Sequence, residues 1–347
     1  MSGKESPALD LARLNAWDGL AALPGSGPVE EAVRLRGGAQ NLLFTIRRAD
    51  GTELVLRRPG RHLREGAAAA FTRESRVLTA LAGTDVPHPH LYASHPDDDV
   101  IGAPFSVLEK IEGFTPKGEL PGSYGTDPSW RRASALALVE GAAKLASVDP
   151  YAVGLGDLSK TDNWLERQTA RYLRMLEGYR DVEEYRATES PHVVPVSRWL
   201  EANRPGGFRI GIVHGDLQFA NVMFTHDAPG LAAIVDWEMA GLGDPLLDLA
   251  WILTAWREKG DPPGSDPYLS PWDGFPSRAE LVAHYGALTG RDTSDFRWFQ
   301  VLACFRLAAL LEGTYVRALN GQMDRAMGDG LHKYAGWLWA KAAQETA

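Results

Sequence analysis

The sequence predicts an α+β fold of two lobes, in which a small β-rich lobe with one main helix precedes a larger helical lobe. Residues 30–58 hold strand-like apolar runs around an Asp-Gly turn signal, whereas the apolar residues after Ser129 mostly follow helical spacing. A chain of 347 residues can also bury a substantial core. We therefore expect an N-terminal lobe over residues 1–111 and a C-terminal lobe over residues 112–347.

The N-terminal lobe is expected to combine a small sheet with a single helix. Strands are predicted at EAVRLR, NLLFTIRR and ELVLRR, and Asp50-Gly51 is a hairpin turn signal between the last two. Residues 65–82 have helix composition and end at Gly83, which suits a helix C-cap. A further strand, APFSVLEKI, leads out of this lobe.

The C-terminal lobe is expected to be helical, with one short β insertion. Helices are predicted at WRRASALALVEGAAKLASV, NWLERQTARYLRMLEGYR and VSRWLEAN, and again over most of the final third. Two short strands near Asn221 and Asp236 interrupt the helices. Residues 261–276, rich in Pro, Gly, Asp and Ser, are expected to form a surface loop.

The bulk composition narrows the classes of function. Hydrophobic residues make up 44% and charged residues 23% of the chain, as in ordinary soluble proteins. The net charge of -9 argues against a general nucleic-acid binder. We see no export signal and no apolar run near the roughly 20 residues that span a bilayer, so we expect a cytoplasmic protein without a membrane partner. The single cysteine, Cys304, suits a reducing compartment and is expected to be a core residue.

Polar residues with oxygen ligands end two apolar runs. Asp216 and Asn221 lie in IVHGDLQFANVMF, and Asp236 ends the next run, in LAAIVDWE. A hairpin centred on the turn at residues 227–230 would place Asn221 opposite Asp236, with Cα atoms about 4.5–5.5 Å apart, unless the register slips by one. Such amide and carboxylate oxygens suit Mg²⁺. Asp216 would ligate the metal or accept a proton; the alternative is that His214, Asp216 and Asn221 only cap turns.

This spacing, H-G-D-x-x-x-x-N followed by two apolar residues and Asp, resembles the aminoglycoside phosphotransferase family of kinase-like enzymes. The matching protein-kinase motifs are H-R-D-x-x-x-x-N and D-F-G. The resemblance implies a protein-kinase-like bilobal fold, ATP and Mg²⁺ as cofactors, and phosphorylation of a small-molecule hydroxyl. It implies Asp216 as the catalytic base, and Asn221 and Asp236 as the Mg²⁺ ligands.

The same resemblance implies that the N-terminal lobe holds the nucleotide. The residues expected to cover the phosphates lie between the first two strands and are Gly37, Gly38, Ala39, Gln40 and Asn41. An ordinary hairpin turn is the alternative for this segment. After the strand Phe105 to Leu108, the backbone of Glu109, Lys110 and Ile111 would bind adenine.

A cation is expected on the third strand, where many relatives have Lys and this chain has Arg57. Neighbouring Arg58 would point to the opposite face, so Arg57 is preferred. Glu74 lies on the apolar helical stripe of Phe71 and Leu78. Because a carboxylate on a buried stripe needs a cation, we expect Glu74 to pair with Arg57 rather than face water.

Two segments after Asp236 indicate which branch of the family the chain resembles. DWEMAGLGDPLLDLAWILTAW and FRLAALLEGTYVRALNGQ resemble the branch found fused to acyl-CoA dehydrogenases, which implies a hydroxyacyl-CoA-like acceptor. That branch commonly has Arg and Asp between the base and the Asn, where this chain has residues 217–220, LQFA. The family positions of Asp244 and Asp248 are interpreted as structural, and Glu238 as a metal assistant or an exposed residue.

Other functions remain open at this point. The chain could be a non-catalytic nucleotide-binding pseudokinase, an aminoglycoside- or choline-type kinase acting on a cationic acceptor, or a metal-dependent hydrolase using the same cluster without ATP. His88, His90 and His95 fit no common zinc spacing. A monomer and a homodimer are both compatible with the sequence.

Overall fold

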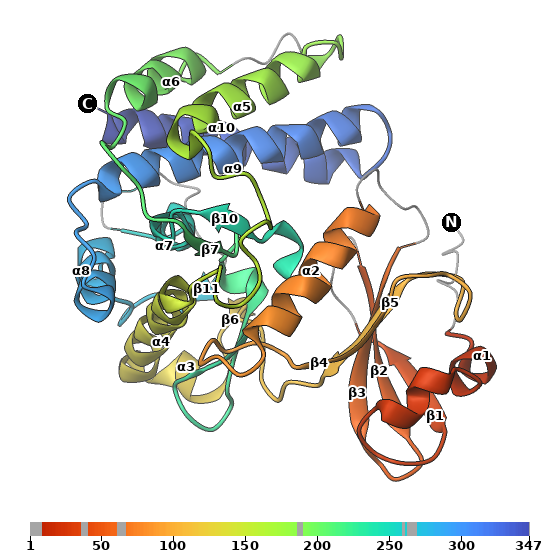
Figure 1. The fold of residues 1–347 in the computed structure, drawn as a ribbon. Coiled ribbons are helices and arrows are strands. Elements are labelled where there is room, and N and C mark those ends of the chain that lie inside the picture. Colours follow the sequence, from red (N-terminus) through yellow and green to blue (C-terminus); the bar gives the residue numbers. More distant parts are fainter. Residues whose placement is uncertain are drawn as a thin grey trace.

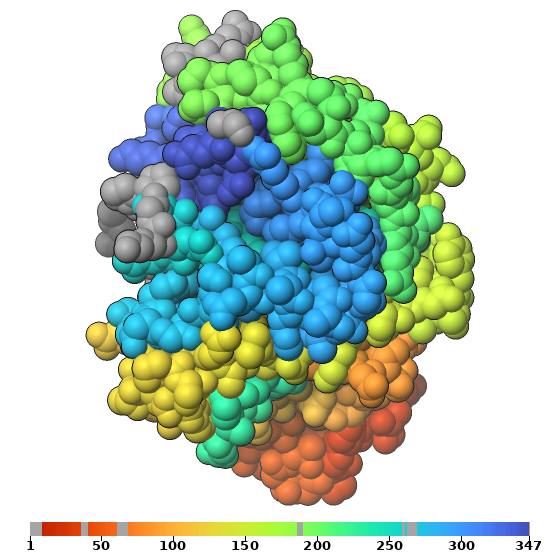
Figure 2. Space-filling model, turned by 90° about the vertical axis from the view of Figure 1, so that its left-hand side faces the viewer, coloured from red at the N-terminus to blue at the C-terminus, as the bar shows by residue number. Residues whose placement is uncertain are grey.

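A computed structural model describes residues 9–35, 41–60, 67–185, 190–258, 261 and 269–346. It has a sheet-based N-terminal lobe and a helical C-terminal lobe, which meet along helix α2 and the segment after strand β5 (Figure 1). The predicted α+β, kinase-like division into two unequal lobes is therefore confirmed. Figure 2 shows the outer face of the helical lobe, with the N-terminal lobe, in red and orange, at its lower end.

The N-terminal lobe is built on an antiparallel sheet with the order β1-β2-β3-β5-β4. Its strands are β1 (Val29–Arg34), β2 (Asn41–Arg48), β3 (Glu53–Pro59), β4 (Leu91–His95) and β5 (Phe105–Glu109). The predicted hairpin forms between β2 and β3, where Gly51 takes a φ of 88° that suits glycine. The sequence did not predict β4.

Two short N-terminal helices extend the core of this lobe. Helix α1 (Leu11–Asn15) starts at Asp10, whose side chain accepts a hydrogen bond from the backbone N–H of Arg13. A 3₁₀ helix follows at Asp18–Ala22. Leu14 and Leu20 from these elements are buried with Phe44 and Leu56 of the sheet. The sequence predicted neither helix.

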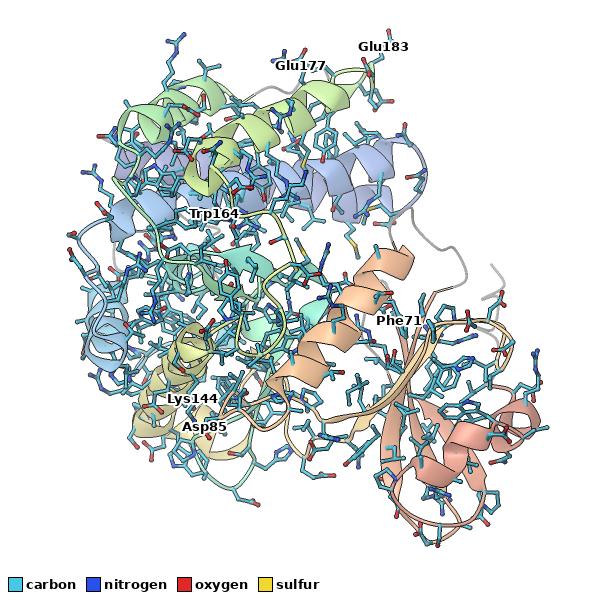
Figure 3. All side chains as sticks on the ribbon, viewed as in Figure 1. Phe71, Asp85, Lys144, Trp164, Glu177 and Glu183 are labelled. Atoms are coloured by element: carbon cyan, nitrogen blue, oxygen red, sulfur yellow. The ribbon has the colours of Figure 1, made fainter. Side chains whose placement is uncertain are left out.

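Helix α2 (Ala67–Leu81) connects the sheet to the other lobe. Its predicted apolar stripe is buried, since Phe71, Leu78 and Leu81 are each at most 8% exposed. Phe71 lies on the side of α2 that faces the strands (Figure 3). The helix also packs against β4 and against the turn at Trp237–Met239, so one rigid element contacts both the sheet and the site described below.

The C-terminal lobe contains the predicted helices around one large core, together with a short helix, α3, that the sequence did not predict. These are α3 (Gly122–Thr126), α4 (Pro128–Ser147), α5 (Trp164–Tyr179), α6 (Val193–Ala202), α7 (Leu246–Thr254), α8 (Arg278–Thr289), α9 (Phe296–Leu319) and α10 (Arg325–Glu345). Within the described ranges, α9 is the one helix long and apolar enough to cross a membrane, but 61% of its apolar window is buried. It packs on α10, α7 and α5, which is the pattern of a core helix.

Short strands hold the loops between these helices. Strands β7 (Gly211–Val213) and β10 (Gly241–Gly243) pair, as do β8 (Val222–Phe224) and β9 (Leu231–Ile234). A further pair, β6 (Gly118–Glu119) and β11 (Leu269–Ser270), adds a strand inside the predicted surface loop. Phe114, just after the first lobe, bridges to Phe224, so the connecting segment is tied to the β8–β9 hairpin.

The β8–β9 register differs by one residue from the register that opposes Asn221 to Asp236. Val222 pairs with Ile234, and the backbone N–H of Val235 donates to the carbonyl oxygen of Asn221 at 2.9 Å. Near the turn Phe224 pairs with Leu231, and an irregularity between Met223 and Phe224 shifts the register before Val222, which leaves an offset of one residue. Asn221 is therefore next to Asp236 across the hairpin, but not directly opposite to it.

Candidate active site

Strand β3 and helix α2 bring Arg57 and Glu74 together in a buried ion pair. The two residues are 8% and 4% exposed, and Arg57 Nη1 donates to Glu74 Oε1. Burial raises the pKa of Glu74 to about 7, against the opposing effect of the Arg57 charge. Although burial disfavours the charged guanidinium, the surrounding carboxylates raise the pKa of Arg57 above its ordinary value. The structure thus contains the pair expected from helical periodicity.

The guanidinium of Arg57 also contacts two carboxylates from the other lobe. Its Nη2 lies 3.0 Å from Asp236 Oδ1 and 3.3 Å from Glu238 Oε2. Asn41, at the start of β2, donates from its side-chain nitrogen to the same Glu238 oxygen at 3.1 Å. Glu238 therefore belongs to this cluster and is not a freely exposed residue. Arg58 instead lies over the Phe44 ring, with 6.0 Å between the guanidinium carbon and the ring centroid.

Asp236 stands where β9 ends and a short 3₁₀ helix, Trp237–Met239, begins. Its φ and ψ of 68° and 64° are left-handed, a conformation that Asp and Asn adopt more readily than most residues. Its side chain is 42% exposed. The backbone therefore turns sharply at this residue, while one carboxylate oxygen faces Arg57 and the side chain stays accessible.

Asp216 lies in the loop between β7 and β8 and is held by three side chains. Its Oδ1 accepts from Gln218 Nε2 at 2.7 Å and from Trp251 Nε1 at 2.9 Å. Its Oδ2 accepts from Asn221 Nδ2 at 2.7 Å. Burial raises the pKa of Asp216 to about 6, and the negative charge of Asp236 adds to this shift, while the three hydrogen bonds oppose it. Such a carboxylate is mostly ionised at neutral pH but close enough to titration to accept a proton.

Asn221 links the loop to the hairpin. Its side-chain nitrogen also donates to the backbone oxygen of Asp216 at 2.8 Å, and the residue is 8% exposed. Since these bonds use the nitrogen, the amide oxygen remains the atom suited to a hard metal ion. The structure therefore places Asn221 next to both Asp216 and Asp236, as the spacing predicted. The β8–β9 pairing that does so is shifted by one residue from the predicted register.

Asp248, on the first turn of α7, supports this loop from behind. Its two carboxylate oxygens accept from the backbone N–H groups of His214, at 2.7 Å, and Gly215, at 2.9 Å. Burial raises the pKa of Asp248 to about 7. Asp244 accepts from the backbone N–H of Leu246 at 3.0 Å and pairs with Arg291 at 2.6 Å. The interpretation of both aspartates as structural is consistent with these bonds.

His214 has a structural position as well. It is fully buried, its Nε2 lies 3.0 Å from the carbonyl oxygen of Val235, and its Nδ1 accepts from the backbone N–H of Asp216. Burial lowers the pKa of His214 to about 4, so the ring is neutral at physiological pH. With Nε2 protonated, this neutral ring ties β9 to the loop that carries Asp216.

The segment after β5 joins the lobes beside this cluster. Glu109 receives a hydrogen bond from the backbone N–H of His90 at 3.1 Å, and Lys110 pairs with Glu53 at 2.6 Å. Their side chains are thus occupied with neighbours. Within the described part of the chain, no backbone carbonyl accepts from the N–H of Lys110 or Ile111. Of the predicted phosphate-covering residues, Gly37, Gly38, Ala39 and Gln40 lie outside the described residues.

Sequence reasoning missed two partners of Asp216. Trp251 follows Asp248 by three residues, so helical spacing places both on the face of α7 that meets the loop. That spacing is the only signal that could have found Trp251. Gln218 lies two residues from Asp216, but nothing in its sequence position predicts that its amide turns back to the carboxylate.

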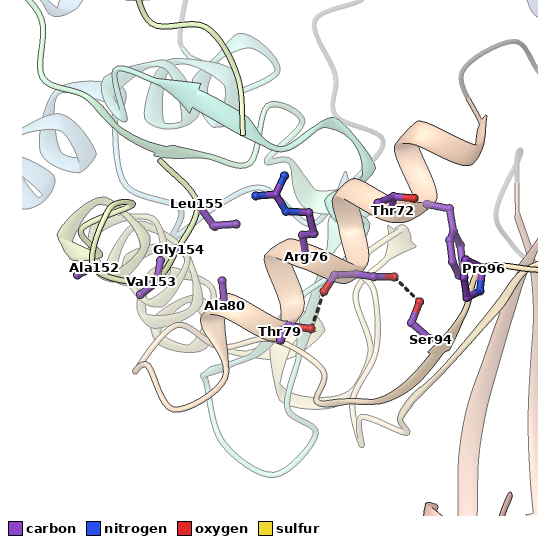
Figure 4. Close-up of a pocket in the computed structure, with 12 residues that line it drawn as sticks. Thr72, Arg76, Thr79, Ala80, Ser94, Pro96, Ala152, Val153, Gly154 and Leu155 are labelled. Carbon is purple, nitrogen blue, oxygen red and sulfur yellow. Dashed lines mark hydrogen bonds between the residues drawn. The ribbon is translucent and has the colours of Figure 1, made fainter. Parts of the chain in front are cut away.

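A separate cavity of about 670 Å³ lies beside α2, along the face that carries Thr72, Arg76 and Thr79 (Figure 4). Its walls are α2, β4 and residues 152–155 of the helical lobe. Arg76 reaches across it, with Nη2 2.6 Å from Asp157 Oδ1. None of the predicted site residues lines this cavity, so it is distinct from the cluster around Asp216.

The chain is similar to known proteins over most of its length. The sequence profile described as "Phosphotransferase enzyme family" matches residues 31–281. Acyl-CoA dehydrogenase family member 10 of Mus musculus is 30% identical over 319 residues, which cover 89% of this chain and 28% of that protein. Family member 11 of Homo sapiens is 28% identical, covering 86% of this chain and 38% of that protein. The chain thus spans less than half the length of these relatives.

Solved structures agree with this picture. A putative aminoglycoside phosphotransferase from Ralstonia eutropha superposes with a TM-score of 0.77 at 29% identity, covering 97% of this chain and 99% of that one. The GDP complex of aminoglycoside 2'-phosphotransferase-IIIa has a TM-score of 0.62 at 15% identity, covering 96% of this chain and 99% of that one. At 15% identity the second likeness concerns the fold alone.

Proposed function

The chain belongs to the phosphotransferase enzyme family, and from this premise we propose that it transfers the γ-phosphoryl group of ATP, with Mg²⁺, to a hydroxyl group of a small molecule. The observation that carries the proposal is the contact between Asp216, Asn221 and the turn at Asp236, beside the buried pair of Arg57 and Glu74. This is the set of groups that phosphoryl transfer by positioning and electrostatics requires.

In this proposal Asp216 is the catalytic base. The hydrogen bonds from Trp251 and Asn221 fix the direction of its carboxylate, so the acceptor hydroxyl would be oriented and then lose its proton to a preset oxygen. A pKa of about 6, raised mainly by burial, keeps the base ionised at neutral pH while favouring proton uptake.

The donor set fits Mg²⁺. The amide oxygen of Asn221 and the accessible carboxylate of Asp236 are hard ligands from adjacent backbone positions, and Mg²⁺ commonly binds one or two protein oxygens together with water and phosphate oxygens. Bound there, the ion would neutralise charge on the phosphates. Arg57 is already held by Glu74, and it would turn its remaining N–H groups from Asp236 and Glu238 toward phosphate oxygens.

For adenine, we assign the N–H groups of Lys110 and Ile111, because no backbone carbonyl in the described ranges accepts from them. Gly37, Gly38, Ala39, Gln40 and Asn41 are proposed to cover the phosphates. For the acceptor, a hydroxyacyl-CoA-like metabolite is the first compound to test, since relatives of this chain are named as acyl-CoA dehydrogenase family members.

The test is incubation with γ-labelled ATP, Mg²⁺ and a panel of alcohols that includes 3- and 4-hydroxyacyl-CoA, choline and an aminoglycoside. We expect a labelled product with at least one hydroxyl compound, and a loss of about 10²–10⁴-fold in Asp216→Asn, which removes the base. Tight Mg·ATP binding without transfer to any acceptor would instead identify a pseudokinase. Thermal stabilisation by Mg²⁺ alone, with none added by ATP, would favour a metal-dependent hydrolase.

A further inference from the structure

Arg306 of α9 is a buried cation that lacks an anionic partner. The residue is 9% exposed, and within the described part of the chain it forms no ion pair and no hydrogen bond. Its Nε is enclosed without a partner, whereas Nη1 and Nη2 are not enclosed in this way. A buried charge is costly unless an anion pairs with it. A binding site for an external anion would explain why this charge is kept here.

Two aromatic rings lie next to the Arg306 guanidinium. Its central carbon lies 5.5 Å from the ring centroid of Tyr172, on α5, and 5.3 Å from that of Trp251, on α7. Cation–π contacts with these two rings stabilise the charge. Such contacts use none of the guanidinium N–H groups, which remain for a bidentate carboxylate or phosphate.

The same indole ring connects Arg306 to the proposed base. Trp251 contacts the guanidinium with its ring and donates its N–H to Asp216 Oδ1 at 2.9 Å. One side chain therefore separates the unpaired cation from the carboxylate that would receive the acceptor's proton. An anion bound at Arg306 would be contacted from α5, α7 and α9 of the helical lobe, whereas Arg57 lies on β3 of the sheet.

Charge balance with Asp248 is the competing explanation. The positive charge of Arg306 lowers the pKa of the Asp248 carboxyl, although the larger effect of burial raises it. Both Asp248 oxygens, however, already accept backbone N–H groups, at His214 and Gly215. No direct bond joins the two side chains in the described structure, so the Arg306 donors stay available.

We propose that Arg306 binds an anionic group, a carboxylate or a phosphate, on the hydroxyl compound that is phosphorylated at Asp216. The inference rests on the proposed function and adds a substrate class to it: hydroxylated anions. Polycationic acceptors such as aminoglycosides would be disfavoured, because an unpaired guanidinium repels them beside the base.

A binding experiment tests this without turnover. The protein is first saturated with Mg²⁺ and a non-hydrolysable ATP analogue, so that added anions do not enter the nucleotide site. Calorimetric titrations then use 3-hydroxybutyrate, inorganic phosphate and the neutral 3-hydroxybutyramide. We expect at least one anion to bind at least tenfold more tightly than the amide, and the two anions show which group is preferred. Absence of anion binding to the wild type would overturn the inference.

Substitutions then locate the bound anion. Arg306→Gln should weaken anion binding at least tenfold, while Arg171→Gln should not change it. Arg171 is the matched control, because it also lies over the Tyr172 ring, at 5.6 Å, but is exposed. Equal anion affinity in wild type and Arg306→Gln would overturn the inference. If Arg306→Gln does not fold, Arg306→Lys is the variant to measure, because it keeps a positive charge near Asp248. Anion binding that is at least fivefold weaker in Arg306→Lys supports the proposal, and unchanged anion binding refutes it.

Turnover separates binding from a structural role. The ratio of kcat/KM for 3-hydroxybutyrate over 3-hydroxybutyramide should fall toward one in Arg306→Gln. A purely structural arginine would lower both rates and keep the ratio, which counts against the proposal. Anion binding at Arg306 without phosphoryl transfer to any acceptor would instead contradict the proposed function, so the two failures are distinguishable.

Discussion

The side-chain nitrogen of Asn221 lies 2.7 Å from Oδ2 of Asp216 and 2.8 Å from the backbone oxygen of the same residue. One amide thus fixes both the loop and the carboxylate, and its own oxygen is left for a metal. In the proposed mechanism, base and metal ligand are therefore set by the same pair of residues. Changes at either position should affect proton transfer and metal binding together.

The pH dependence of turnover should report the buried base. Burial raises the pKa of Asp216 from 3.8 to about 6, so the reactive, ionised form is lost as the pH falls below 6. We expect kcat/KM to fall about tenfold per pH unit below this value and to level off above pH 7. A pH–rate profile measured with saturating Mg·ATP checks this. An acid limb near pH 4 would mean that the base is not desolvated as the structure indicates.

Removing one member of the Arg57–Glu74 pair should destabilise the fold. Arg57→Met would leave Glu74 buried without its cation, at a cost of about 3–5 kcal/mol in the free energy of unfolding. The double variant Arg57→Met/Glu74→Leu should recover most of this loss, because neither charge is then buried alone. Urea unfolding of both variants measures the effect.

The double variant Arg57→Met/Glu74→Leu should regain stability but not nucleotide binding. Its fold is restored, but the proposed phosphate contact of Arg57 is missing, so Mg·ATP binding should remain weak. Recovery of both properties would show that Arg57 has only a structural role. No recovery of stability would show that the pair does not act as a unit.

Asp236→Asn should separate metal binding from folding. Asn tolerates the φ of 68° at this position, so the melting temperature should stay within a few degrees of the wild type. The loss of a carboxylate ligand should weaken Mg-dependent ATP binding by at least about tenfold. Asp157→Asn, at an exposed carboxylate paired with Arg76, is the control and should bind normally. Normal Mg·ATP affinity in Asp236→Asn would remove this residue from the metal site.

Asp248→Asn should change how stability depends on pH. Because burial raises the pKa of Asp248 from 3.8 to about 7, the native state holds this proton more tightly than the unfolded state does. Its stabilising contribution is complete below pH 3.8 and is lost as the pH rises through about 7. The variant cannot titrate, so its free energy of unfolding should fall less between about pH 4 and pH 7.

The same variant should cost stability at acidic pH, by about 1–3 kcal/mol, because an amide offers one acceptor oxygen for two backbone N–H groups. Urea unfolding at several pH values measures both effects. His214, whose pKa burial lowers to about 4, loses its contribution as the pH falls from 6.5, but it does so in both proteins. Identical pH slopes would show that Asp248 does not carry this proton.

Local signals were enough to predict the architecture. The Asp50-Gly51 turn, the apolar stripe of α2 and the long helical patterns specify elements that depend mainly on neighbouring residues, and all of them are present. Strand β4 was missed because LYASH is short and only partly buried, so its alternation is weak. Its pairing with β5 depends on contacts far apart in the sequence.

The site could be predicted only as far as motifs reach. The spacing from Asp216 to Asn221 and Asp236 identified the neighbours, but a register shift inside strands of three and four residues leaves no trace in the sequence. Glu238 could not be assigned because its partners, Arg57 and Asn41, come from the other lobe. For Arg306, the informative fact is the missing partner, which requires the whole fold to be known.

The way in which Asp248 holds the loop also bears on how such a protein can change over time. Its carboxylate grips main-chain atoms of His214 and Gly215, and main-chain atoms persist through almost any substitution. The sequence of residues 217–220 can therefore change while these bonds keep the backbone of His214 and Gly215 in place, although a change at Gln218 removes one hydrogen bond to Asp216. At these positions the chain differs from the branch of the family that it resembles. Substitutions there could therefore change which hydroxyl compound is phosphorylated without rebuilding the catalytic centre.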